Sequence, residues 1–338
     1  MYISLSLSLF FLSFIFFAYI RSNAYFKKNF STSDEFLLDS KRNSSFKVIT
    51  GTGIIFLILF YLSNTFIYFF DKNILFPNRY FFSLFFLCIL TIFSFFDDKK
   101  SIDPILRLII QLICVYVSIA SINISYFPIP LKVGMLIGII VWIYLINITN
   151  FIDGSDGFCA VNTISFFIGL LVIDNYVINL FSSHFAYILV PILLVFLLFN
   201  FPNAKIYMGD TGAVFLGYLI GFSFLEVAIA TNIIYPIILF IYPILDCTIT
   251  LIKKIYRGYM PWARHGDYFF LELKKKTPFK DRKIISLFLL KISFFQNMLN
   301  ILFLFLAIYY KNNFILFFNF IFAVVVILIF YFKRINKI

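Results

Sequence analysis

Apolar segments of about 20 residues, separated by short polar stretches, recur along the whole of this chain. A helix of about 20 apolar residues is long enough to cross the hydrocarbon core of a bilayer. The pattern therefore predicts an all-α polytopic membrane protein, a single integral membrane domain over residues 1–338 with about eleven transmembrane helices. The predicted helices cover residues 2–20, 48–70, 80–96, 104–123, 132–149, 159–178, 184–200, 212–230, 232–252, 285–309 and 313–332.

Lysine and arginine are concentrated in alternate loops of this arrangement. The basic side comprises the C-terminal tail and loops at about 21–47, 97–103, 150–158, 201–211 and 253–284. The opposite loops carry only Lys72, Arg79, Lys132 and Lys311. Because cytoplasmic loops carry an excess of Lys and Arg, the sequence predicts that the basic side and the C-terminus are cytoplasmic and the N-terminus is outside.

The amino-acid composition agrees with a membrane protein and favours lipid over nucleic acid as a binding partner. Hydrophobic residues make up 62% of the chain and charged residues 13%, against roughly 25% charged in soluble domains. The loop bias accounts for the net charge of +12 and suits anionic lipid headgroups. No nucleic acid is expected as a partner, because no soluble basic domain exists to carry it. The four cysteines stand singly in or beside apolar segments, which argues against disulfides and a zinc site.

The acidic residues lie at the predicted cytoplasmic ends of helices. Asp97 and Asp98 end the third helix. Adjacent carboxylates at a helix C-terminus are electrostatically unfavourable, so a cation such as Mg²⁺ or the neighbouring Lys99 and Lys100 should compensate them. A solvated end-cap without function is the alternative. Charged groups near hydrocarbon are costly, which favours the functional interpretation.

The strongest signal follows the fifth helix. Asn147, Asn150, Asp153 and Asp156 stand at three-residue intervals, with Gly154 and Gly157 between and after the acids. This spacing places the polar side chains along one side of a helix end and its turn. Hard oxygen donors of this type suit Mg²⁺ bound together with substrate phosphates. A calcium-binding EF-hand loop is excluded, because Ile164 stands where that loop requires glutamate.

Two further polar segments complete the candidate site. Asp210 lies between Gly209 and Gly212 at the start of the eighth helix, shortly after Lys205. Such a helix start offers free backbone N–H groups to a phosphate and a carboxylate to a metal; simple N-capping by the aspartate is the alternative. The long basic loop carries Arg257, Arg264 and His265, which can engage a diphosphate or position a sugar.

Taken in order, these motifs resemble the polyprenyl-phosphate sugar-1-phosphate transferases. The D-D pair, N-x-x-N-x-x-D-G-x-D-G and G-D-x-G of that family match Asp97-Asp98, 147–157 and 209–212. Its R-G…H-R-x-H loop is similar to Arg257-Gly258 and His265, and its early D…S-S-H-K…T…G stretch to 39–53. The loop departs from the pattern at Gly266 and Tyr268, and the early stretch has Phe46 for histidine.

The resemblance implies a bacterial inner-membrane enzyme whose active site faces the cytoplasm. It would transfer a sugar-1-phosphate, of an N-acetylhexosamine or a 6-deoxy-amino sugar, from a UDP-sugar to undecaprenyl phosphate and release UMP. This reaction would initiate O-antigen, capsule or another envelope glycan. Homodimer formation stays open.

The resemblance also assigns roles to residues. Asp97, Asp98 and Asp156 would be catalytic, with Asp97 orienting or deprotonating the lipid phosphate. Asp210, Asn150 and Asp153 would hold Mg²⁺, with Mn²⁺ as the alternative ion. The substrate-binding residues would be Asn147, Lys205, Arg257, Arg264 and His265.

Other functions remain as alternatives. An ion-coupled transporter should gather its acids near the membrane midplane, whereas these gather at helix ends. A phospho-MurNAc-pentapeptide transferase is disfavoured by the loop departures, and an inactive scaffold in an envelope-polysaccharide complex would explain the same departures. A CDP-alcohol phosphatidyltransferase lacks its D-G-x-x-A-R motif here.

Overall fold

The computed structural model describes residues 2–23, 25–26, 31–32, 48–70, 78–100, 102–120, 122, 130–202, 204–258, 282–311 and 314–335. Within these ranges the chain is almost entirely helical. The helices are α1 (Tyr2–Ser22), α3 (Ile54–Phe70), α4 (Asn78–Lys99), α5 (Pro104–Ile119), α6 (Leu131–Ile152), α7 (Phe158–Tyr176), η2 (Phe181–Ser183), α8 (His184–Asn200), α9 (Gly209–Ala230), α10 (Ile234–Leu239), α11 (Ile241–Tyr256), α13 (Arg282–Tyr309) and α14 (Phe314–Ile335).

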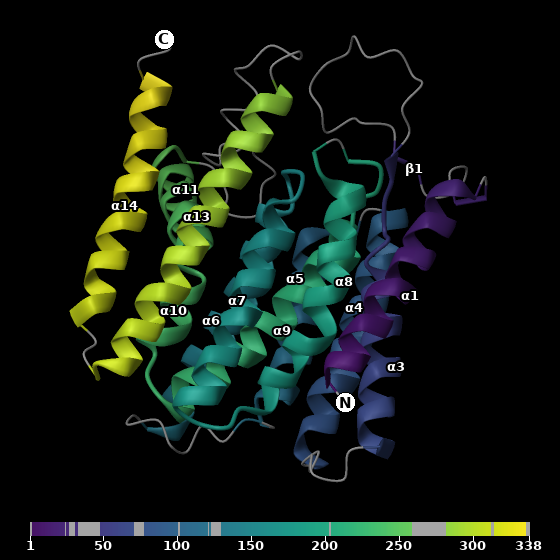
Figure 1. The fold of residues 1–338 in the computed structure, drawn as a ribbon, viewed down its shortest axis with the longest axis horizontal. Helices are drawn as coiled ribbons and strands as arrows, with labels where there is room; N and C mark the ends of the chain where they lie inside the picture. The colour runs from purple at the N-terminus through teal and green to yellow at the C-terminus, as the bar shows by residue number, and fades with distance from the viewer. Residues whose placement is uncertain are drawn as a thin grey trace.

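The long helices stand side by side in one bundle (Figure 1). Helices α13 and α14 pack together at one edge, and α1 and α3 pack together at the other. Among the described residues, seven helices are long and apolar enough to cross a membrane. This agrees with the predicted all-α polytopic membrane protein. The number of crossings and their orientation stay predictions.

Helix α9 is the centre of the bundle. Nearly every residue from Thr211 to Ala228 is buried, and α9 packs most extensively on α6 and α4. A helix that is apolar on all sides is expected in such a position. The indole Nε1 of Trp142 on α6 donates a hydrogen bond of 2.9 Å to the carbonyl of Tyr218 on α9. Because α9 is enclosed by its neighbours, its first turn is held in a fixed place at one end of the bundle.

Two predicted helices differ from the observed ones. The predicted helix over 232–252 is divided into α10 and α11 at Phe240. Pro243 explains the break, because its ring clashes with the carbonyl four residues earlier and it has no N–H to donate. The predicted helix over 48–70 begins only at Ile54, and the preceding residues Val48–Ile49 form strand β2, which pairs with β1 (Ser31–Thr32).

The segment that leads into α3 lies against the segment that leads into α9. The N–H of Tyr207 donates to the carbonyl of Ile49 at 2.7 Å, and the N–H of Gly53 donates to the carbonyl of Met208 at 3.0 Å. The approach is so close that a Cβ on Gly53 would lie 2.1 Å from the nitrogen of Gly212. The Thr50–Gly53 stretch, singled out in the sequence, therefore supports the start of α9.

Candidate active site

The aspartate pair at the end of α4 has two different environments. Asp97 is buried; its Oδ1 accepts the N–H of Ile102 at 2.6 Å, and its Oδ2 lies 2.8 Å from Nη1 of Arg107. Asp98 instead accepts hydrogen bonds from the first turn of α9. Its Oδ1 accepts the N–H of Asp210 at 2.8 Å, and its Oδ2 accepts both the N–H of Thr211 at 3.0 Å and the Thr211 hydroxyl.

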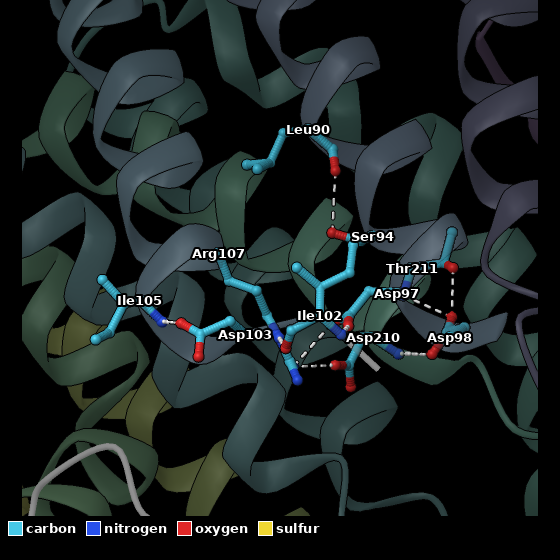
Figure 2. A network of polar contacts seen from close by, with 10 residues as sticks. All are labelled: Leu90, Ser94, Asp97, Asp98, Ile102, Asp103, Ile105, Arg107, Asp210 and Thr211. Carbon is cyan, nitrogen blue, oxygen red and sulfur yellow. Dashed lines mark hydrogen bonds and ion pairs between the residues drawn. The ribbon is translucent and has the colours of Figure 1, made fainter. Parts of the chain in front are cut away.

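Arg107 joins the ends of three helices (Figure 2). Its Nη1 contacts Asp97 and also lies 2.9 Å from Oδ2 of Asp210, so one nitrogen bridges two carboxylates. Its Nε donates to the carbonyl of Ile102 at 3.1 Å. The guanidinium thus supplies positive charge to Asp97, one of the two acids that were expected to require it, whereas Mg²⁺ or Lys99 and Lys100 were the predicted sources.

The sequence around Arg107 explains its position. Asp103 caps α5 by accepting the N–H of Ile105 at 2.8 Å, and Pro104 occupies the first helical position. Asp is a strong N-cap residue, and Pro at the first position is pre-organised for a helix. The Asp-Pro pair therefore fixes where α5 begins. Arg107 then falls in the first turn, next to the end of α4.

The start of α9 does not offer all the free N–H groups that the sequence predicted. That prediction is wrong for Asp210 and Thr211, because their N–H groups donate to Asp98. The physical reason is that a helix N-terminus attracts an anion, and here the chain itself supplies one. Asp210 is therefore held by its backbone while its side chain faces Arg107 (Figure 2).

A second acidic segment lies between α6 and α7. Asn150 is in the last turn of α6, Asp153 follows the helix as its C-cap, and Gly157 has a φ of +75° directly before α7. The N–H of Gly157 donates to Oδ1 of Asn200 at 2.6 Å, and Nδ2 of Asn200 donates to the carbonyl of Ile206 at 2.9 Å. Asn200 thereby ties this segment to the one that leads into α9.

Electrostatics connect the two acidic segments. Burial is the main cause that raises the pKa of Asp153 well above its ordinary value. The carboxylates of Asp210, Asp98 and Asp156 raise that pKa further, in decreasing order of effect. A group of carboxylates with this mutual repulsion is one that a cation stabilises.

The donor atoms fit a hard divalent cation. Asp210, Asp153 and Asn150 supply carboxylate and amide oxygens, which are the ligands that Mg²⁺ prefers. Among the described residues, no three His, Cys, Asp or Glu side chains form a group that could hold a metal ion. Mg²⁺ usually binds to one or two carboxylates and completes its shell with water and substrate phosphate. The residues present are compatible with that mode of binding.

The predicted substrate-binding residues have different positions. Asn147 donates to Oε1 of Gln111 on α5 at 2.9 Å and so faces the helix that carries Arg107. Lys205 and Arg257 are exposed, the latter at the end of α11. Arg264 and His265, like the departures at Gly266 and Tyr268 and the early residues 39–47, lie outside the described residues.

Arg107, Gln111 and Asn200 take part in this arrangement and were not predicted from the sequence. A detectable signal existed for Arg107, because an arginine in an apolar helix close to hydrocarbon is costly and calls for a partner. Gln111 follows it by one helical turn on the same side. Asn200 carried no such signal, since its role depends on the turn at Gly157.

The fold and the site define a polytopic helical protein with an acidic, arginine-bridged cluster at the ends of α4, α5, α6 and α9. The sequence profile of glycosyl transferase family 4 matches residues 80–229, the segment that contains this cluster. This match agrees with the family resemblance that the motifs indicated.

Two curated relatives each match part of the chain. A probable undecaprenyl-phosphate N-acetylglucosaminyl 1-phosphate transferase of Bacillus subtilis (strain 168) is 28% identical over 183 residues, 49% of this chain and 50% of that protein. A phospho-N-acetylmuramoyl-pentapeptide-transferase of Leuconostoc citreum (strain KM20) is 30% identical over 137 residues, 40% of this chain and 41% of that protein. The chain thus spans about half the length of these relatives or less.

Proposed function

We propose that this protein transfers a sugar-1-phosphate from a UDP-sugar to undecaprenyl phosphate and releases UMP. The observation that supports it best is the meeting of Asp97, Asp98, Asp210 and Arg107 at helix ends, within the segment that matches the family. Phosphoryl transfer requires mainly positioning and neutralisation of charge, and carboxylates with an arginine are groups that can do both.

The reaction forms one P–O bond and breaks another. An oxygen of the lipid phosphate attacks the β-phosphorus of the UDP-sugar, and the bond from the β-phosphorus to the bridging oxygen breaks. The bonding electrons leave with UMP, and sugar-diphospho-undecaprenol remains. A phosphate monoester is itself a competent nucleophile, so a direct displacement needs no aspartyl-phosphate intermediate.

The residues of this chain have separable roles in that proposal. Asp210, Asp153 and Asn150 would bind Mg²⁺ (or Mn²⁺), which when bound neutralises charge on the diphosphate. Arg107 and Asp97 would orient the lipid phosphate, and Asp97 would accept its proton. Asp156, in the turn before Gly157, would support the geometry of the Asp153 segment.

The substrate-contacting residues are assigned around this centre. Asn147 would contact substrate from α6, and Lys205 and Arg257 are exposed basic residues that suit a phosphate. Arg264 and His265 are proposed to contact the diphosphate or the sugar. The polyprenyl chain would lie along the exposed apolar faces of the helices in the inner membrane, with the site on the cytoplasmic side.

A donor panel tests the proposal. Purified protein with undecaprenyl phosphate is given UDP-GlcNAc, UDP-GalNAc, a UDP-6-deoxy-amino sugar and UDP-MurNAc-pentapeptide, and the lipid product is identified by mass spectrometry. We expect a product from an N-acetylhexosamine or 6-deoxy-amino donor, as in initiation of an envelope glycan. A product from the pentapeptide donor would instead establish the activity named for the Leuconostoc citreum relative.

A further inference from the structure

Asp98 differs from its neighbour in that its observed hydrogen bonds all go to one place, the first turn of α9. Its carboxylate accepts the N–H groups of Asp210 and Thr211, at 2.8 and 3.0 Å, and the hydroxyl of Thr211. Both carboxylate oxygens are therefore engaged. The N-terminus of α9, where the helix dipole is positive, is filled by an anion that belongs to α4.

The backbone around Asp98 is shaped for this contact. Gly209 has a φ of +72°, a conformation that L side chains rarely adopt, and a Cβ there would lie 2.5 Å from Oδ2 of Asp98. A glycine is thus required on two counts at the residue before Asp210. The backbone at Gly209 thus fits closely around the Asp98 carboxylate. Asp103, in contrast, caps the exposed start of α5.

We infer that Asp98 is a positioning residue, whose carboxylate is the built-in anion of the α9 N-terminus and holds Asp210 opposite Asp97 and Arg107. In this role Asp98 does not touch the reacting atoms, and it keeps substrate phosphate away from the α9 N–H groups. The expected effect on kcat depends on the proposed transferase activity. The expected effect on structure does not depend on it: Asp98→Ala should leave an empty anion site at the start of α9 that a small carboxylate can enter.

The experiment uses formate as that carboxylate. Purified Asp98→Ala is unfolded thermally in detergent with sodium formate, and with sodium chloride at the same ionic strength. We expect formate to raise the midpoint of Asp98→Ala saturably and to leave the wild type unchanged. Asp103→Ala is the matched control and should not respond, because water already solvates the exposed N–H groups that Asp103 caps.

The kinetic arm separates positioning from catalysis. A small displacement of Asp210 should lower the kcat of Asp98→Ala by about 10²-fold with KM for both substrates unchanged. Formate should restore part of that kcat. A folded Asp98→Ala that formate neither stabilises nor reactivates would overturn the inference and make Asp98 catalytic.

Thr211 provides a second test where Asp98→Ala does not fold. Thr211→Val removes only the hydroxyl bond to Asp98 and keeps the size of the buried side chain. We expect about a tenfold lower kcat with unchanged KM, and normal kinetics for Thr211→Ser. Equal kinetics for the two variants would contradict the inference. The formate effect on unfolding needs no substrate, so it is measurable even if the proposed transferase activity is absent.

Discussion

Replacement of Arg107 by methionine should destabilise the protein, because it removes the cation that two carboxylates share. One nitrogen of Arg107 lies 2.8 Å from Asp97 and 2.9 Å from Asp210, and the side chain of Asp97 is only 3% exposed. Methionine keeps an unbranched apolar side chain and removes the charge. Two carboxylates are then left facing each other without their shared cation.

The magnitude follows from the burial of the three groups. Removal of one partner from a buried ion pair costs about 3–5 kcal/mol. The side chains of Arg107 and Asp210 are 20% and 31% exposed, so water screens part of this cost and the lower end, about 3 kcal/mol, applies. At about 2 °C per kcal/mol for a large domain, the unfolding midpoint should fall by about 6 °C.

Arg107→Lys is the matched variant. A lysine ammonium can replace Nη1 between the two carboxylates, but it has no counterpart of the Nε that donates to Ile102 at 3.1 Å. The loss should then be about 1 kcal/mol, the contribution of one hydrogen bond. Thermal unfolding in detergent should rank the wild type above Arg107→Lys and Arg107→Lys above Arg107→Met. A midpoint of Arg107→Met equal to that of the wild type would refute the reasoning.

Two other substitutions test the frame of the site. Gly209→Ala places a Cβ at a φ of +72° and 2.5 Å from Asp98, so thermal unfolding should show a loss of at least about 1–2 kcal/mol of stability. Gly217→Ala is the comparison variant and measures the effect of crowding alone within α9. Asn200→Leu removes both bonds that tie Gly157 to the carbonyl of Ile206, which should cost about 2 kcal/mol. Limited proteolysis should then cut the Asp153 segment faster than in the wild type, and an unchanged cleavage rate would show that Asn200 does not hold it.

The helices were predictable because their apolar length is a local property of the sequence. The breaks were less so. Pro243 lies inside an apolar run that reads as one helix, yet it divides α10 from α11. Val48–Ile49 is apolar like the helix that follows, and it forms a strand because a partner strand and the N–H of Tyr207 supply its hydrogen bonds.

The acidic residues of the site were also predictable, since carboxylates beside glycines at helix ends are unusual in so apolar a chain. Their individual contacts were not. Asp97 and Asp98 are adjacent and chemically identical, and only the position of α9 sends one to Arg107 and the other to an N-terminus. The charge that compensates Asp97 comes from Arg107 on α5, and residue spacing alone does not predict that α5 packs back against α4.

Release of UMP is the most direct test of the central claim. Purified protein is assayed with undecaprenyl phosphate, the UDP-sugar panel and Mg²⁺, beside Asp210→Asn and the control Asp103→Asn, which keeps a good helix cap. The account predicts release that requires both lipid and metal, is lost in Asp210→Asn and persists in Asp103→Asn. No release by the folded wild-type protein with any donor, or equal release by Asp210→Asn, would contradict it.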